Sequence, residues 1–265
     1  MMWRTALVSL LALALQLSGC STPQKDESAS ATAERLYKDA RDDMDSGSFD
    51  RAIKTLERVE GLAAGSLLAQ QALLDLAYIN WRSGERATAL TTIDRFIKLN
   101  PSSPALDYAL YLKGVVNFND NLGLLGTAFG QDLSERDQRA SRDAWQAFKQ
   151  LTDQFPNSRY APDARTRMAF IVNSLANYEV HVARYYLRRG AYVAAANRAQ
   201  QAVTEFQQSP ATEEALWIMV QSYDKLQLNT LRDDADRVLR ANFPKSIYLG
   251  GPGVASSDKP WWKFW

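Results

Sequence analysis

The sequence predicts an all-α fold, a superhelical array of about five stacked helical hairpins. The main indication is a serine that closes each expected unit, at spacings of 37, 55, 51 and 37 residues. Fourteen residues before the serine stands an alanine in four of the five units. A repeat in the mid-thirties with a small residue at each helix crossing is typical of stacked hairpins. The serines are Ser66, Ser103, Ser158, Ser209 and Ser246, and the earlier positions hold Ala52, Ala89, Ala144, Ala195 and Arg232.

The first element is an expected signal peptide, residues 1–19. Residues 6–17 form an apolar run of 12 behind Arg4, whereas a membrane-spanning helix needs about 20. The run ends in Leu-Ser-Gly-Cys, which is similar to the bacterial lipoprotein box, where the cysteine becomes the first mature residue and carries acyl chains. The alternative is a buried free cysteine, but Cys20 is the only cysteine and lies at the expected cleavage point.

Lipid on Cys20 would tether the protein to a membrane through a polar linker, residues 20–31. One acyl chain binds a membrane marginally, at about 0.8 kcal/mol per buried CH₂, whereas the three chains of a mature lipoprotein hold stably. Ser21, and not Asp, follows the cysteine, which favours the outer membrane by the enterobacterial sorting rule. We therefore expect a protein anchored on the periplasmic face of the outer membrane, with no cofactor besides this covalent lipid.

The first two hairpins begin the folded body. Gly47 and Gly84 supply the turn after each first helix, and Pro101 marks the boundary after the second hairpin. Apolar residues recur every three or four positions, as on a helix face, and no segment shows sustained strand alternation. The Gly-x-Phe-x-x-Ala run that ends at Ala52 resembles the tetratricopeptide repeat.

The third and fourth units exceed 37 residues by 18 and 14. Because the alanine-to-serine spacing stays at 14, the extra residues must lie between the two helices of each hairpin. Residues 119–137 are rich in glycine and predict a structured loop with exposed apolar residues. Residues 162–189 predict a single helix of about 28 residues, roughly 42 Å long, which should project beyond its neighbours.

The tail, residues 247–265, is turn-rich and ends in Trp-Trp-Lys-Phe-Trp. Three of the seven tryptophans are among these last five residues. Either the tail lies on a partner or membrane interface, where Trp is favoured, or it is a disordered end that folds back on the body. The sequence leaves both interpretations open.

No catalytic or metal-binding set is visible in the sequence. His181 is the only histidine, which excludes paired-histidine metal sites and a Ser-His dyad elsewhere. The chain has 31 basic and 30 acidic residues, and this balance argues against electrostatic binding of nucleic acid. We therefore expect a protein that is not an enzyme and that binds neither metal nor nucleic acid.

In tetratricopeptide arrays, particular positions of each first helix line a concave groove, and here they hold aromatic residues and arginines. The alternative is that these aromatics belong to the core, although Leu36, Leu73 and Leu110 already occupy the core frame. The same register also places Leu74 and Val115 in the groove. An aromatic groove with arginines suits a peptide that is rich in aromatics and ends in a carboxylate. The expected groove residues are Tyr37, Arg41, Tyr78, Trp81, Arg82, Tyr108, Tyr111 and Phe118.

A second candidate surface, for partner docking, lies near the end of the long helix. It includes Tyr185, Arg188 and, further along the chain, Arg198. Arginine is favoured at protein interfaces because its planar fork pairs carboxylates bidentately. The alternative is that Arg188 complements the dipole at the C-terminal end of the helix. Arg198 is the first choice for a docking residue.

Several segments are informative in combination, namely the lipoprotein box and residues 94–97, 107–114, 155–165, 188–199 and 237–244. Together they resemble the BamD (ComL) family, tetratricopeptide-repeat lipoproteins of the outer-membrane β-barrel assembly complex. The resemblance covers about residues 15–246, and the tail departs from it.

This resemblance implies a non-catalytic scaffold with defined partners. The C-terminal repeats would hold the barrel insertion subunit through its last periplasmic domain, and would also bind the accessory lipoproteins. The N-terminal repeats would receive the C-terminal targeting signal of unfolded outer-membrane proteins.

Two other functions fit the repeats less well. A pilotin-type lipoprotein for a pilus or secretion pore would not need the glycine-rich insert or the long helix. A helical accessory domain of a cell-wall lytic enzyme would need a catalytic lobe, for which the repeats leave no room. The expected organisation is a signal peptide at 1–19, a lipidated linker at 20–31, N-terminal repeats with the peptide groove at 32–118, C-terminal repeats with partner docking at 119–246, and a tail at 247–265.

Overall fold

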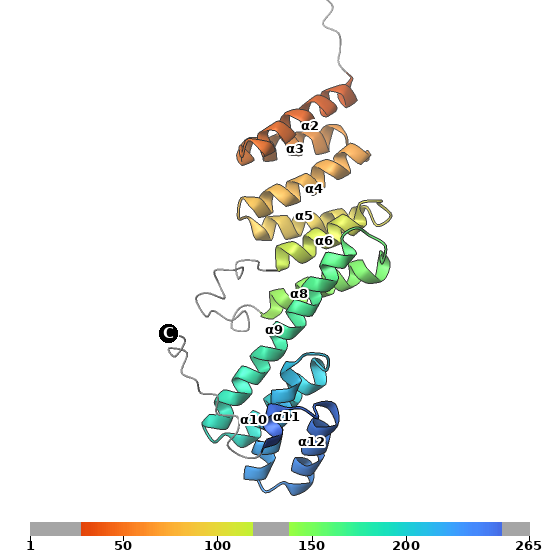
Figure 1. The fold of residues 1–265 in the computed structure, drawn as a ribbon. Helices are drawn as coiled ribbons and strands as arrows, with labels where there is room; N and C mark the ends of the chain where they lie inside the picture. Colours follow the sequence, from red (N-terminus) through yellow and green to blue (C-terminus); the bar gives the residue numbers. More distant parts are fainter. Residues whose placement is uncertain (1–27, 119–137, 251–265) are drawn as a thin grey trace, which may run out of the picture. The chain divides into compact units, whose positions relative to one another are not determined.

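The computed structural model describes residues 28–118 and 138–250, and within these ranges the chain forms ten α-helices, one 3-10 helix and no strand (Figure 1). The all-α prediction is therefore confirmed for this part of the chain. The helices are α2 (Ala29–Asp45), α3 (Phe49–Leu62), α4 (Leu67–Arg82), α5 (Arg86–Leu99), α6 (Leu106–Asn117), α8 (Gln138–Gln154), α9 (Ala161–Arg188), α10 (Tyr192–Glu205), α11 (Ala211–Lys225), α12 (Asn229–Asn242) and the 3-10 helix η4 (Ile247–Gly250).

Each expected closing serine completes a turn between two helices. In all five turns the serine N–H donates to the carbonyl three residues earlier, at 2.9 to 3.1 Å. The side-chain oxygen then accepts a hydrogen bond from a backbone N–H two or three residues later, as from Ala105 to Ser103 and from Tyr160 to Ser158, both at 3.2 Å. The hydroxyl thus satisfies an N–H that a helix start leaves open, which is why serine recurs there.

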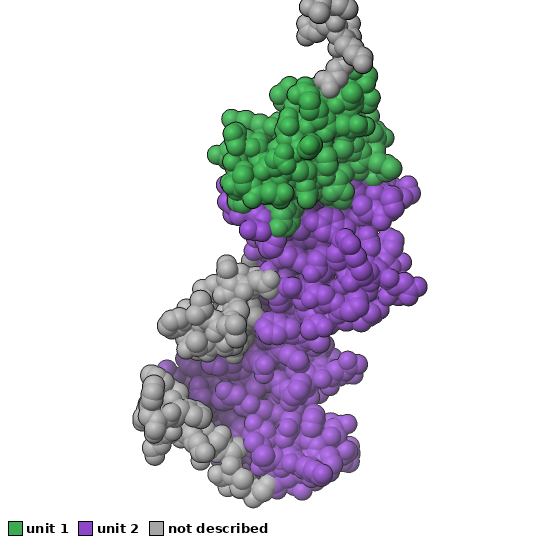
Figure 2. All heavy atoms as spheres, turned by 45° about the horizontal axis from the view of Figure 1, so that its top comes forward, with its two compact units in different colours: residues 1–79 green, residues 80–265 purple. Residues whose placement is uncertain are grey.

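The chain divides within α4 into two compact units, residues 1–79 and 80–265 (Figure 2). The first unit contains α2, α3 and most of α4. Helix α2 packs against α3. Their shared core gathers the buried side chains of Leu36, Ala40, Leu56, Val59 and Leu76.

The second unit contains the end of α4 and every later helix. Its helices pack in sequence-adjacent pairs, α6 on α8, α9 on α10 and α11 on α12, while α5 packs on α6 and α8 on α9. One core surrounds Phe148, Leu151 and Ile171, and another surrounds Val180 and Ile218. Helices α4 and α5 are joined by a turn at Gly84, whose φ is +91°.

The repeated alanines are buried against neighbouring helices. Small side chains allow two helices to approach closely, because the distance between the axes depends on the residues at the contact. Arg232, at the fifth position, is only partly buried and pairs with Asp224 and Asp233. The alanines with 0% exposure are Ala52, Ala89, Ala144 and Ala195 before the serines, and Ala72, Ala109, Ala164 and Ala215 after them.

The long helix is confirmed as α9, which has 28 residues and Pro162 in its first turn. Its first half packs in one core through Ile171, and its second half packs in the other core through Val180 and Ala183. The expectation that this helix projects beyond its neighbours is wrong, because α10 and α11 cover its second half. Helix α9 instead connects two cores.

Three expected features lie outside the described residues. They are the signal peptide with Cys20, the insert at 119–137, and the aromatic end of the tail.

Gly114 tests the packing of α6 against α8. A Cβ at this position would overlap the ring of Phe148, whereas a Cβ at Gly61 would meet nothing within 4 Å. We expect Gly114→Ala to lower the free energy of unfolding by about 1–3 kcal/mol, because overpacking outweighs the helix propensity of alanine. The control Gly61→Ala should be neutral or stabilising by up to about 1 kcal/mol. Urea unfolding followed by circular dichroism measures both, and a Gly114→Ala variant as stable as the wild type would contradict the packing.

Candidate functional site

The expected groove residues divide between the two compact units, so they form two partial surfaces that are described separately. The first unit holds Tyr37, Arg41 and Tyr78, and the second holds Trp81, Arg82, Tyr108, Tyr111 and Phe118.

In the first unit, Tyr37 and Arg41 of α2 gather around Asp75 of α4. The Tyr37 hydroxyl donates to Asp75 Oδ2 at 2.7 Å, and Gln71 Nε2 donates to Oδ1 at 3.1 Å. Arg41 Nη1 lies 3.6 Å from Oδ2, and the exposed side-chain fractions are 47% for Arg41 and 7% for Asp75. A buried acid therefore holds two groove residues in place, while the arginine stays open to solvent.

The electrostatics of this cluster follow from the burial of Asp75. Burial raises the pKa of Asp75, although the hydrogen bond from Tyr37 and the charge of Arg41 act in the other direction. Burial and the hydrogen bond to Asp75 also raise the pKa of Tyr37, so its hydroxyl remains a donor. Asp75 could not be predicted from the sequence, because a lone acid among apolar residues of α4 belongs to no motif.

In the second unit, α6 and α9 bring aromatic and charged side chains onto one face. The ring of Tyr111 stacks on Tyr160 with centroids 4.7 Å apart, and Tyr108 lies 5.5 Å from the same ring. The Tyr111 hydroxyl donates to Asp163 Oδ2 at 2.8 Å, and Arg167 Nε donates to the same oxygen at 2.7 Å. Burial alone would raise the pKa of Asp163, yet these two donors hold its pKa below the usual value.

The same face continues toward the end of α6. The guanidinium of Arg167 lies 5.0 Å from the ring centre of Phe118, and Phe118 meets Phe170 edge-on at 5.8 Å. Phe170 is 46% exposed, so an incoming aromatic side chain can reach its ring. We call this set the α6–α9 aromatic face; it comprises Tyr108, Tyr111, Phe118, Tyr160, Asp163, Arg167 and Phe170.

Not every groove position faces outward. Leu74 is 1% exposed and Val115 is 8% exposed, so their placement in the groove was wrong and both belong to the core. Trp81, Tyr111 and Phe118 are partly buried and pack against the core around Phe148. These three side chains therefore contribute to the core as well as to the surface.

The repeat register did not predict Tyr160 or Arg167 as site residues. The spacing of four between Asp163 and Arg167 is nevertheless a recognisable signal of a helical ion pair.

Arg198 of the expected docking surface pairs with Glu179. Its Nη1 donates to Glu179 Oε2 at 3.0 Å, and the exposed side-chain fractions are 41% for Arg198 and 3% for Glu179. This hydrogen bond raises the pKa of Arg198. A second buried acid therefore orients a half-exposed arginine.

Tyr185 and Arg188 lie at the end of α9. Tyr185 is 45% exposed, packs edge-on against Tyr186 at 5.8 Å, and lies under the guanidinium of Arg189 at 5.4 Å. Arg188 is exposed in the last turn, where its charge complements the helix dipole. In the part of the chain that the structure describes, no interaction joins either residue to Arg198.

Among residues 28–118 and 138–250, no helix is both long enough and apolar enough to cross a membrane. Within the same residues, no group of three or more His, Cys, Asp or Glu side chains could hold a metal ion.

The paired helices, their repeated closing turns and their buried alanines define a helical-repeat protein. The family profile of the YfiO outer membrane lipoproteins matches residues 29–238. The chain belongs to this family. It is 45% identical over 260 residues to "Outer membrane protein assembly factor BamD" of Neisseria meningitidis serogroup B, covering 96% of this chain and 97% of the relative.

A second relative of the same name matches at lower identity. The protein of that name from Haemophilus influenzae is 34% identical over 240 residues, and the match covers 91% of each chain. Among solved structures, the MamA protein is 15% identical with a TM-score of 0.34, over 80% of this chain and 95% of that one.

The buried carboxyl of Asp75 should leave a signature in the pH dependence of stability. Because the folded-state pKa of Asp75 lies above its unfolded value, the folded state binds the extra proton, and stability falls as pH rises between the two values. Asp75→Asn cannot titrate and should lack this component. Tyr37→Phe removes a donor to the carboxylate and should steepen the decline.

Urea unfolding at a series of pH values from about 4 upward measures these slopes. Equal slopes in the wild type and Asp75→Asn would show that the buried acid does not titrate as described.

Proposed function

We propose that this chain is a scaffold lipoprotein of outer-membrane protein assembly, which binds segments of unfolded β-barrel proteins and docks to the barrel insertion subunit. The observation that carries the proposal is family membership. Relatives that match over nearly their whole length are named outer membrane protein assembly factors. A repeat array suits this role because it presents extended surfaces to other chains.

The α6–α9 aromatic face is the proposed client site in the second unit. Its rings are held by stacking and by the Asp163 hydrogen bonds. The side chains of the site therefore lose little conformational entropy when a client binds. Aromatic side chains of a client would stack on Phe170 and Phe118, and Arg167 would add a cation over a ring. In the first unit, the exposed guanidinium of Arg41 would pair with a client carboxylate.

The proposed docking site centres on Arg198. Glu179 engages one nitrogen of the guanidinium, and 41% of the arginine side chain is exposed toward a partner. A carboxylate on the barrel insertion subunit would complete the pairing, because the planar fork of arginine accommodates two carboxylates. Tyr185 and Arg188, at the end of α9, would add a separate contact area, and accessory lipoproteins would bind the same C-terminal repeats.

Anchoring belongs to the same proposal. Lipid on Cys20 would hold the scaffold at the periplasmic face of the outer membrane, with residues 20–31 as the tether. Growth in radioactive palmitate tests this step, since Cys20→Ser should abolish labelling.

Client binding can be tested on Phe170. We expect Phe170→Ala to weaken the affinity for a synthetic aromatic-rich β-barrel C-terminal peptide about 5- to 10-fold, because one exposed stacking ring is lost. Leu231→Ala, with the same 46% exposure on α12, is the matched control and should bind as the wild type does. Fluorescence anisotropy of the labelled peptide measures both. Unchanged affinity in Phe170→Ala would remove this face from the proposal.

Docking can be tested without leaving a buried charge unpaired. Replacing Arg198 alone would strand the carboxylate of Glu179, which destabilises a fold strongly. We therefore compare Glu179→Gln with Glu179→Gln/Arg198→Ala, which differ only at the arginine. The single variant should retain the barrel insertion subunit in pull-downs from membranes, and the double variant should lose most of it. Equal retention, with equal helicity by circular dichroism, would refute the role of Arg198.

A further inference from the structure

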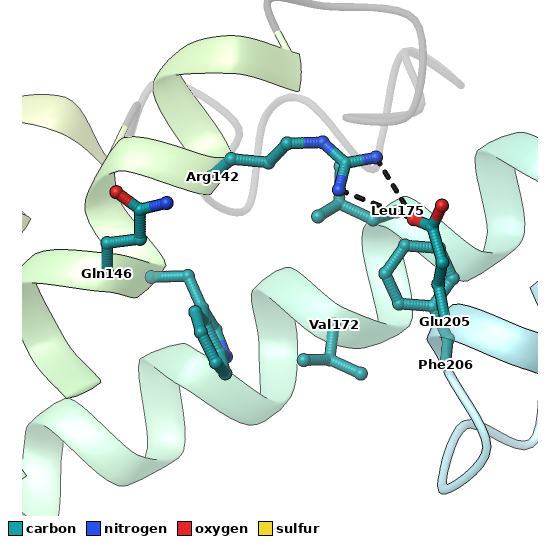
Figure 3. Close-up of a pocket in the computed structure, with 7 residues that line it drawn as sticks. Arg142, Gln146, Val172, Leu175, Glu205 and Phe206 are labelled. Atoms are coloured by element: carbon teal, nitrogen blue, oxygen red, sulfur yellow. Dashed lines mark hydrogen bonds and ion pairs between the residues drawn. The ribbon is translucent and has the colours of Figure 1, made fainter.

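A cavity of about 310 Å³ opens between α8, α9 and the end of α10 (Figure 3). Its apolar walls are Trp145, Val172, Leu175 and Phe206. The volume is at the lower end of the range for small-ligand sites, roughly 300–1,000 Å³. Such a space admits one or two aromatic side chains, and neither the α6–α9 aromatic face nor the docking site includes it.

The rim of this cavity carries an ion pair that can open easily. Arg142 Nη1 and Nη2 each lie 3.4 Å from Glu205 Oε2, and the two side chains are 44% and 39% exposed. A long, half-exposed pair of this kind contributes little to stability. The guanidinium also lies 6.0 Å from the ring centre of Phe206. The rim therefore offers a cation to an aromatic ring and a carboxylate to a positive charge.

We propose that residues 261–265 of this same chain dock in the cavity. This segment reads Trp-Trp-Lys-Phe-Trp and thus combines four large rings with one positive charge. The rings match the apolar walls, and an indole is the strongest partner for the guanidinium of Arg142. Lys263 complements Glu205. The proposed function makes no use of this segment, so docking of the segment does not depend on the proposed function.

The segment begins within reach of the cavity. Tyr248 in η4 stacks on Trp217 of α11 with ring centroids 5.1 Å apart, so the last described residues are held on that helix. From Phe206 in the cavity wall, the chain makes one tight turn and then runs about 9 Å along α11 to Trp217. Residues 251–261, eleven in number, can extend over about 36 Å. The tether is therefore long enough.

Photo-crosslinking tests the proposal in the full chain. Benzoylphenylalanine in place of Phe264 keeps an aromatic side chain and reports its neighbours after illumination and peptide mass spectrometry. We expect crosslinks within one molecule to residues 138–154 and to the part of α9 around Val172. Crosslinks between two copies, crosslinks confined to other helices, or none to protein at all would each overturn the proposal.

Matched variants decide whether the cavity itself is the site. Val172→Trp fills the cavity and should reduce these crosslinks at least tenfold, whereas Val193→Trp, on an exposed position of α10, should not. Glu205→Lys leaves the core untouched and reverses the rim charge, so it should also reduce them. Helicity by circular dichroism verifies that each variant is folded. Undiminished crosslinking in both Val172→Trp and Glu205→Lys would contradict docking at this cavity.

Discussion

Close approach between neighbouring helices is the constraint on which the rest of this structure depends. The alanines at the crossings are fully buried, and Gly114 packs directly under the ring of Phe148. Because the interaxial distance is set by such small residues, each helix pair has one favoured way to pack. The closing serines then fix where the next helix begins. A repeat array can vary its outward residues freely as long as these crossing and turn positions persist.

Two buried acids fix the positions of two arginines at the surface. Asp75 and Glu179 lie on different helices of different units, yet each is almost fully buried and paired with a half-exposed arginine of another helix. A buried carboxylate is unfavourable unless it is paired and hydrogen-bonded, so its partner is held firmly. Arg41 and Arg198 are therefore presented at defined positions instead of moving freely. Both are residues that the proposed function uses.

Aromatic residues serve the core and the surface together. Trp81, Tyr111 and Phe118 each pack one side of the ring against the core of the second unit. Tyr111 and Asp163 meet although they are 52 residues apart, because α6 and α9 share a face. Groove and core are therefore not exclusive alternatives for these side chains. A ring that is half buried contributes to packing and still offers an edge or face to a client.

Local signals in the sequence determined the helices, the closing turns and the long helix α9. Serine, proline and small residues act within a few positions of the chain, and their spacing is visible without coordinates. Tertiary structure alone decided that Leu74 and Val115 are core, that α10 and α11 cover the second half of α9, and that Asp75 and Glu179 hold arginines. These outcomes depend on which helices pack together. Contacts between residues distant in sequence produce no periodic pattern in a single sequence, so they could not be predicted from it.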